Sequence, residues 1–142
     1  DGAGFVIVMS ERLMKELNLT PIARMASYAV AGCEPSLMGI GPVFAIPKAL
    51  AQAGLKLNDI DQIELNEAFA SQALAVVKEL QIDPAKLNPN GGAIAIGHPL
   101  GSSGSRIVAT LAHALQQEKG KIGVSVICNG GGGAFTIVIE VC

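Results

Sequence analysis

Apolar and polar residues alternate along the chain in two patterns, one typical of strands and one typical of helices. Short runs rich in β-branched residues predict strands at residues 4–10 ("GFVIVMS"), 21–32, 59–67, 121–128 and 134–142. The last two runs are joined by a short glycine-rich link, so we expect them to pair as an antiparallel hairpin.

Helices are predicted between these strands. Ser10 is a suitable N-cap for a short helix over residues 11–17, and Gly54 is a suitable end for a helix that begins at Pro42. Apolar residues at helical spacing predict a third helix at about residues 68–80. A fourth begins near Ser102 or Ser103 and ends before residue 120, which is glycine.

Strands that alternate with helices and finish in a hairpin indicate an α/β fold. We predict one domain over residues 1–142, built on a mixed sheet of about five strands with helices on both faces. The length is sufficient for one domain with a real core, and half of the residues are apolar.

Composition and charge exclude several classes of protein. Only 15% of the residues are charged, the net charge is −2 and no basic run occurs, so neither a disordered chain nor a nucleic-acid partner is indicated. No apolar stretch is long enough to cross a bilayer. The absence of a leader sequence predicts a cytoplasmic protein, although the first residues read as the interior of a fold, so the true N-terminus is expected elsewhere.

Cysteine and histidine are few. Three cysteines at irregular spacing argue against a disulfide framework and for a reducing compartment. With no CxxC motif and two histidines, we predict no metal site.

Glycine concentrates around one histidine and one cysteine. His98 lies between Gly97 and Pro99, just before a helix start rich in small residues, although a lone histidine in such a place is more often a turn residue. Cys128 ends a predicted strand and precedes Asn129 and four glycines, whose N–H groups are suited to stabilising a thiolate or an oxyanion. The alternative for Cys128 is a buried structural cysteine.

A third candidate is Asn66, at the change from strand to helix in "LNEAF", where an asparagine also serves as a helix cap. Met38 in "LMGIGPVFA" is either a pocket wall or a core residue. Together, an amide, an imidazole and a thiol on strand ends or tight loops suit chemistry at a thioester or ketone carbonyl.

Four blocks in order, "MGIGPVFA", "NEAFA", "NGGAIAIGHPLGSSGSR" and "CNGGGGAF", resemble the C-terminal half of the thiolase family. The resemblance implies one half of the thiolase fold and acyl transfer between CoA thioesters, with coenzyme A as substrate or product and no other cofactor. It implies that His98 activates the nucleophile and lines an oxyanion hole and that Asn66 holds a water there. Cys128 then moves protons, Gly130 donates its N–H to a second oxyanion, and Met38 and Phe69 line the substrate tunnel.

The chain departs from the family in two ways. The nucleophilic cysteine belongs to the N-terminal half, which is absent, and Cys33 in "AGCEPSLMG" does not replace it. We therefore expect no turnover from this chain alone, and an N-terminal thiolase half, acyl-CoA and further copies in a homodimer or homotetramer as its partners. Asn129 stands where the family usually has an apolar residue.

Other functions remain open at this point. A non-catalytic interaction or dimerisation domain has no need of Asn66, His98 and Cys128 together. Condensing enzymes of the same fold that act on carrier proteins often lack a cysteine like Cys128. A cysteine hydrolase requires His98 to contact Cys128, with a carboxamide or carboxylate behind the histidine.

Overall fold

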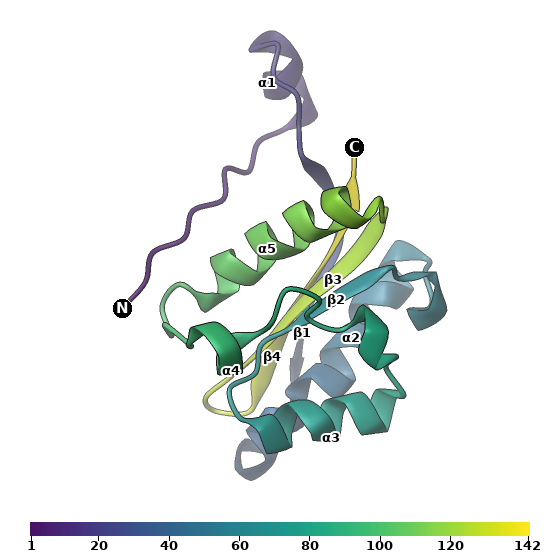
Figure 1. Ribbon diagram of the computed structural model, residues 1–142. Coiled ribbons are helices and arrows are strands. Elements are labelled where there is room, and N and C mark those ends of the chain that lie inside the picture. The colour runs from purple at the N-terminus through teal and green to yellow at the C-terminus, as the bar shows by residue number, and fades with distance from the viewer.

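The computed structural model describes residues 1–142 and contains one four-stranded sheet (Figure 1). The strands are β1 (Ala23–Gly32), β2 (Gln62–Leu65), β3 (Ile122–Asn129) and β4 (Gly133–Val141), in the order β1-β4-β3-β2. The helices are α1 (Glu11–Glu16), α2 (Gly41–Ala53), α3 (Ala70–Leu80), α4 (Ala93–Ile96) and α5 (Ser103–Glu118). Three 3₁₀ turns complete the order: η1 (Pro35–Ile40), η2 (Leu57–Asp59) and η3 (Pro84–Lys86). None of the helices is both long and apolar enough to pass through a bilayer.

The sheet is mixed, as predicted. β4 pairs antiparallel with β1 on one side and with β3 on the other, and the expected hairpin joins β3 to β4. β2 pairs parallel with β3, in a register that sets Leu65 beside Val126. The carboxyl ends of β2 and β3 therefore lie at the same edge of the sheet, where sites collect in open α/β folds.

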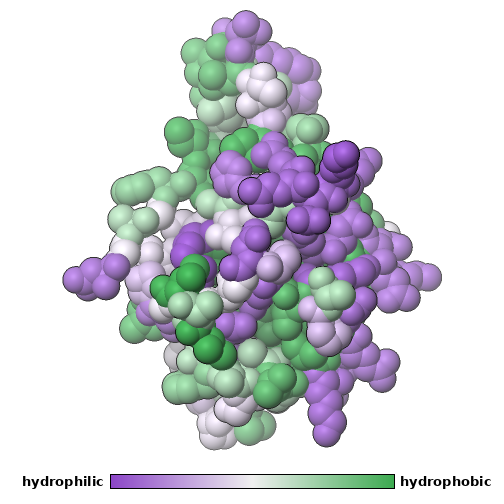
Figure 2. Space-filling model, viewed as in Figure 1, coloured by the Kyte–Doolittle hydropathy of each residue, from purple (hydrophilic) through white to green (hydrophobic).

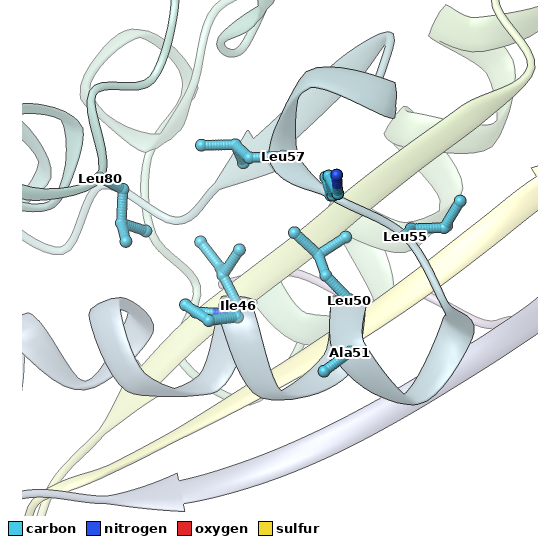
Figure 3. A pocket seen from close by; sticks show the side chains of 8 residues that line it. Ile46, Leu50, Ala51, Leu55, Leu57 and Leu80 are labelled. Carbon is cyan, nitrogen blue, oxygen red and sulfur yellow. The ribbon is translucent and has the colours of Figure 1, made fainter.

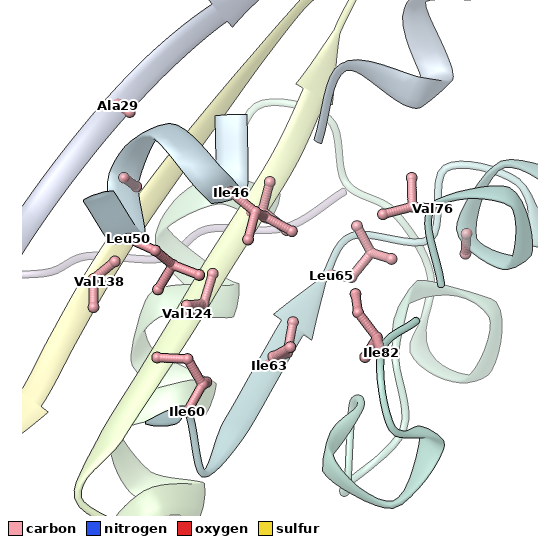
Figure 4. Packing of buried hydrophobic residues seen from close by; sticks show 13 residues of the cluster. Ala29, Ile46, Leu50, Ile60, Ile63, Leu65, Val76, Ile82, Val124 and Val138 are labelled. Atoms are coloured by element: carbon pink, nitrogen blue, oxygen red, sulfur yellow. The ribbon is translucent and has the colours of Figure 1, made fainter. Parts of the chain in front are cut away.

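Helices cover both faces of the sheet. Neighbouring residues of a strand point to opposite sides, so apolar residues on both sides need a covering layer. Val138 of β4 packs in the larger core with Ile46 and Leu50 of α2, together with residues of β2, β3 and α3 (Figure 4). The next residue, Ile139, packs on the other face against α5. The sheet, with the carboxyl ends of β2 and β3 at one edge, thus lies between two helical layers.

The predicted helix ends are largely confirmed. The Ser10 side chain accepts a hydrogen bond from the Leu13 N–H at the start of α1, and Gly54 ends α2 with a φ of 69°. That left-handed backbone favours glycine.

The predicted strand at residues 4–10 is wrong, and this explains why the sheet has four strands rather than about five. Phe5 is 91% exposed and Ile7 83%, and no strand forms there. A strand needs a neighbour for its backbone hydrogen bonds and a surface for its apolar side chains, and none of the four strands pairs with this segment. Figure 2 shows it as an arm of hydrophobic side chains that leaves the body of the molecule at the left.

Candidate active site

Asn66 follows β2 directly and is 1% exposed. Its backbone N–H donates to the Val126 carbonyl at 3.0 Å, which extends the parallel pairing by one residue. Asn88 fixes the residue before it, because its side chain accepts from the Leu65 N–H at 2.9 Å and donates to the Leu65 carbonyl at 3.0 Å. The Asn66 backbone is therefore fixed at the carboxyl edge of the sheet.

His98 reaches Asn66 from the loop after α4. Gly97 ends α4 with a φ of 91° and turns the chain so that His98 faces β2. Its Nε2 atom lies 3.3 Å from the Asn66 Nδ2 atom, and its Nδ1 atom lies 2.6 Å from the Ser103 Oγ atom. The structure thus brings together two of the predicted site residues. It adds Ser103, which the sequence indicated only as a helix start.

The Ser103 hydroxyl has two hydrogen-bond partners. It lies 3.2 Å from the Pro99 carbonyl as well as 2.6 Å from His98 Nδ1. When it donates to Pro99, it accepts from Nδ1–H and leaves Nε2 unprotonated; when it donates to Nδ1, Nε2 carries the proton. Ser103 therefore accommodates both neutral forms of the imidazole.

Cys128 lies near the end of β3, at the sheet edge that also carries Asn66, and is 8% exposed. Burial raises the pKa of its thiol, and the nearby Cys33 thiol acts in the same direction. The thiol is therefore neutral near pH 7. No hydrogen bond joins Cys128 to His98, whose nitrogens contact Asn66 and Ser103, and this removes the support for a cysteine hydrolase.

Gly130 lies in the hairpin loop after Cys128, where an added Cβ would meet no atom within 4 Å. Its neighbours Gly131 and Gly132 have φ values of 88° and 85°. The loop therefore presents bare backbone on an open side, as the glycine run predicted. Asn129 is exposed, and its Nδ2 atom donates to the Gly130 carbonyl of the same loop at 2.8 Å.

The predicted tunnel residues lie on two neighbouring elements. Met38 is half-buried in η1, and Phe69 caps α3 with 63% of its surface exposed. The two elements touch, since an added Cβ at Gly39 would lie 2.7 Å from the Gln72 side chain of α3. Phe69 has no covering partner within this chain.

A buried polar layer lies behind Asn66, between β2 and α5. Gln62, Glu64 and Asn66 alternate on the face of β2 that α5 covers, and all three are buried. Burial raises the pKa of the Glu64 carboxyl to about 7, although the Arg106 guanidinium opposes this and Glu67 adds to it. Oxygens of these three β2 residues and the guanidinium nitrogens of Arg106 have no hydrogen-bond partner.

Two cavities lie elsewhere. One of about 200 Å³ is lined mainly by apolar residues of α2, η2 and α3, including Ile46, Leu50 and Leu80 (Figure 3). The other, of about 180 Å³, lies beside η3. Neither includes Asn66, His98 or Cys128, so neither cavity is the candidate site.

Comparison with known proteins identifies relatives over almost the whole chain. The family described as "Thiolase, C-terminal domain" matches residues 19–141. A mitochondrial 3-ketoacyl-CoA thiolase from Rattus norvegicus is 56% identical over 99% of this chain, and an acetyl-CoA acetyltransferase from Escherichia coli is 54% identical over the same share. The crystal structure of human mitochondrial 3-ketoacyl-CoA thiolase superposes with a TM-score of 0.92 at 54% identity, covering 94% of this chain and 34% of that one.

These relatives contradict one prediction, and they show that this chain matches only part of each relative. The prediction of a cytoplasmic protein is contradicted, because relatives as similar as the rat and human proteins are mitochondrial by name. The chain spans only 35% of the length of the rat protein and 36% of the Escherichia coli protein.

Proposed function

Since this chain belongs to the thiolase family, we propose that it is the C-terminal catalytic part of a longer thiolase that transfers acyl groups between CoA thioesters. The observation that carries this proposal is the contact between Asn66 and His98, which aims an amide and an imidazole at one point on the carboxyl edge of the sheet. The reaction joins an acyl-CoA to acetyl-CoA, or cleaves a 3-ketoacyl-CoA with free CoA. We propose residues 1–142 as one part of that protein.

The difficult step is proton removal next to a thioester carbonyl, because the enolate oxygen needs hydrogen-bond donors already in place. In our proposal His98 Nε2 and a water held by Asn66 supply them. The same nitrogen, once unprotonated, takes the proton of the nucleophilic cysteine, and Ser103 serves both states of the ring.

Cys128 is proposed as the acid and base at the substrate α-carbon and the CoA sulfur. A buried thiol that is neutral at rest can donate a proton to the leaving CoA thiolate and later remove one from the α-carbon. The Gly130 N–H is proposed to hold the oxyanion of the acylated intermediate, and Met38 and Phe69 to line the tunnel. We expect no resident cofactor beyond coenzyme A as substrate or product.

The proposal requires an N-terminal half, which would bring the nucleophilic cysteine. Apolar side chains left open support such a partner: Phe5 and Ile7 in the N-terminal arm, and Tyr28, Val30 and Phe135 where β1 and β4 extend beyond α5. Val30 pairs with Phe135 across β1 and β4, so the sheet residues adjoin one another, and exposed apolar surface of this kind marks an interface. We expect the assembled protein to be a homodimer or homotetramer and the chain alone to lack turnover.

The test is turnover by the longer polypeptide that contains this chain, followed as CoA release from acetyl-CoA or as thiolysis of acetoacetyl-CoA. Cys128→Ser should lower kcat by about 100-fold or more, because it removes the proposed acid and base. Cys142→Ser is the matched control, since Cys142 is exposed at the chain end. Turnover that survives Cys128→Ser would remove the proton-transfer role, and a wild-type protein with no turnover would favour a non-catalytic interaction domain.

A further inference from the structure

We propose that Glu67 is a positioning residue that holds the His98 loop against β2, and that Gly92 is glycine because the Glu67 carboxylate occupies the space beside it. This inference rests on the proposed function, since it assigns Glu67 to the alignment of Asn66 with His98. It concerns how the two segments are held together and adds no group that touches the substrate.

The Glu67 carboxylate connects the end of β2 with the loop that carries His98. Its Oε2 atom accepts from the Ile94 backbone N–H at 2.9 Å, within the first turn of α4. Its Oε1 atom accepts from Asn88 Nδ2 at 3.1 Å. Because α4 has only four residues and ends at Ile96, a shift of its first turn also moves His98.

Both groups that face the carboxylate are donors. The orientation of the Asn88 amide is fixed, because its Oδ1 atom accepts from the Leu65 N–H while Nδ2 donates to the Leu65 carbonyl. Nδ2 therefore presents N–H to Glu67, as the Ile94 backbone does. A carboxylate accepts both bonds, whereas a glutamine amide must place its own N–H₂ against one of the two donors.

Gly92 supplies the second, independent observation. Its φ of −102° is available to any residue, so backbone conformation does not require glycine there. An added Cβ would instead lie 2.4 Å from the Glu67 Oε2 atom and 2.8 Å from Asn88 Nδ2. The glycine and the carboxylate thus fit one another, and a side chain at residue 92 would displace the carboxylate from its bonds to Ile94 and Asn88 and so release the loop from β2.

The first experiment compares Glu67→Gln with Glu79→Gln in the longer polypeptide. Glu79 is an exposed glutamate of α3 whose side chain makes no hydrogen bond. We expect Glu67→Gln to lower kcat about 10- to 100-fold with KM changed less than about twofold, because His98 moves while substrate contacts remain. The ¹⁵N resonances of the His98 ring, assigned by their loss in His98→Asn, should also shift.

Wild-type kcat and unmoved His98 resonances in folded Glu67→Gln would overturn the proposal. If the wild-type protein has no acyl-transfer turnover at all, the proposed function is wrong, and the His98 resonances alone then decide whether Glu67 holds the loop. The two failures are therefore distinguishable.

The second experiment is a double-mutant cycle on variants shown to be folded, which isolates the coupling between residues 67 and 92. Gly92→Ala should lower kcat by about 100-fold in the wild-type background and by at least several-fold less when Glu67→Ala is already present. Gly32→Ala is the control, since its added Cβ would meet nothing closer than 3.7 Å. Effects of Gly92→Ala and Glu67→Ala that simply multiply would show that the two residues act separately and would overturn the proposal.

Discussion

The Asn66 side-chain nitrogen lies 3.3 Å from His98 Nε2, although the two residues are 32 positions apart in the sequence. Asn66 is held by the strand that ends before it, and His98 is held by the short helix and glycine that precede it. A pair of side chains on two separately anchored segments has little freedom to lose when a ligand binds.

We predict that Asn66→Ala lowers kcat by about 100- to 1,000-fold in the longer polypeptide, because it removes the anchor of the proposed oxyanion-hole water and the loss of one such donor usually costs that much. Steady-state kinetics with acetoacetyl-CoA provide the measurement. Asn90→Ala is the control, because Asn90 is an exposed residue just before α4 whose side chain makes no hydrogen bond. Equal kcat values for the two variants would show that the Asn66 amide has no part in the reaction.

Ser103→Ala should lower kcat about 10-fold, because the imidazole loses the partner that its Nδ1 atom has in either protonation state. Ser102 is the matched control: it is the adjacent serine, it is buried, and its side chain makes no hydrogen bond. The pH dependence of kcat should change in Ser103→Ala and remain as in wild type in Ser102→Ala. A Ser103→Ala profile that superposes on wild type would contradict this role.

The hairpin glycines offer a test of stability. Gly131 and Gly132 have nearly equal positive φ, but an added Cβ is free at Gly131 and lies 2.3 Å from the Cys33 carbonyl oxygen at Gly132. Gly131→Ala should cost about 1–2 kcal/mol in free energy of unfolding from backbone strain alone, and Gly132→Ala about 4 kcal/mol or more. Chemical denaturation measures both, and equal losses would mean that the hairpin shifts to relieve the contact.

Glu64 should make stability depend on pH. Its pKa rises from an ordinary value of 4.5 to about 7 on folding. Between these two pH values the folded state therefore keeps a proton that the unfolded state has released. The stabilisation of the folded state by protonated Glu64 is fully present below pH 4.5 and is lost as the pH rises through about 7. The loss in free energy of unfolding is at most about 3 kcal/mol.

Glu64→Gln removes this loss, because the amide stays neutral at every pH. The free energy of unfolding of the variant, relative to wild type, should therefore rise between pH 4.5 and 7.5. Denaturation curves at the two pH values measure the difference, in which titration of Asp61, Glu140 and the other carboxyls cancels. Parallel pH dependence in the two proteins would show that Glu64 is ionised in the folded state.

Local sequence signals predict the elements that depend on contacts between residues close in the sequence. The Ser10 and Gly54 caps, the helical spacing of α3 and the glycine link of the hairpin each act within a few residues, and each was confirmed. Residues 4–10 carry an equally strong strand pattern, yet a strand is defined by its neighbour, and no neighbour lies beside them.

The sequence indicates candidate site residues but not the contacts between them. Glycine around His98 and Cys128 indicated close backbone approach, but nothing local indicated that Ser103 would reach the imidazole. Nor does the sequence around Asn88 reveal that its side chain pairs with Leu65, because that contact depends on a return of the chain 23 residues later.

The Asn88 contact also protects the sheet. β2 is an edge strand, and an edge with free N–H and C=O groups invites pairing with another chain. Here the Asn88 amide occupies both backbone groups of Leu65, and the Asn88 backbone N–H occupies the Ile63 carbonyl at 2.8 Å. Backbone groups on the outer side of β2 are thereby already hydrogen-bonded within the chain. This disfavours intermolecular strand addition and amyloid-like growth beside the candidate site.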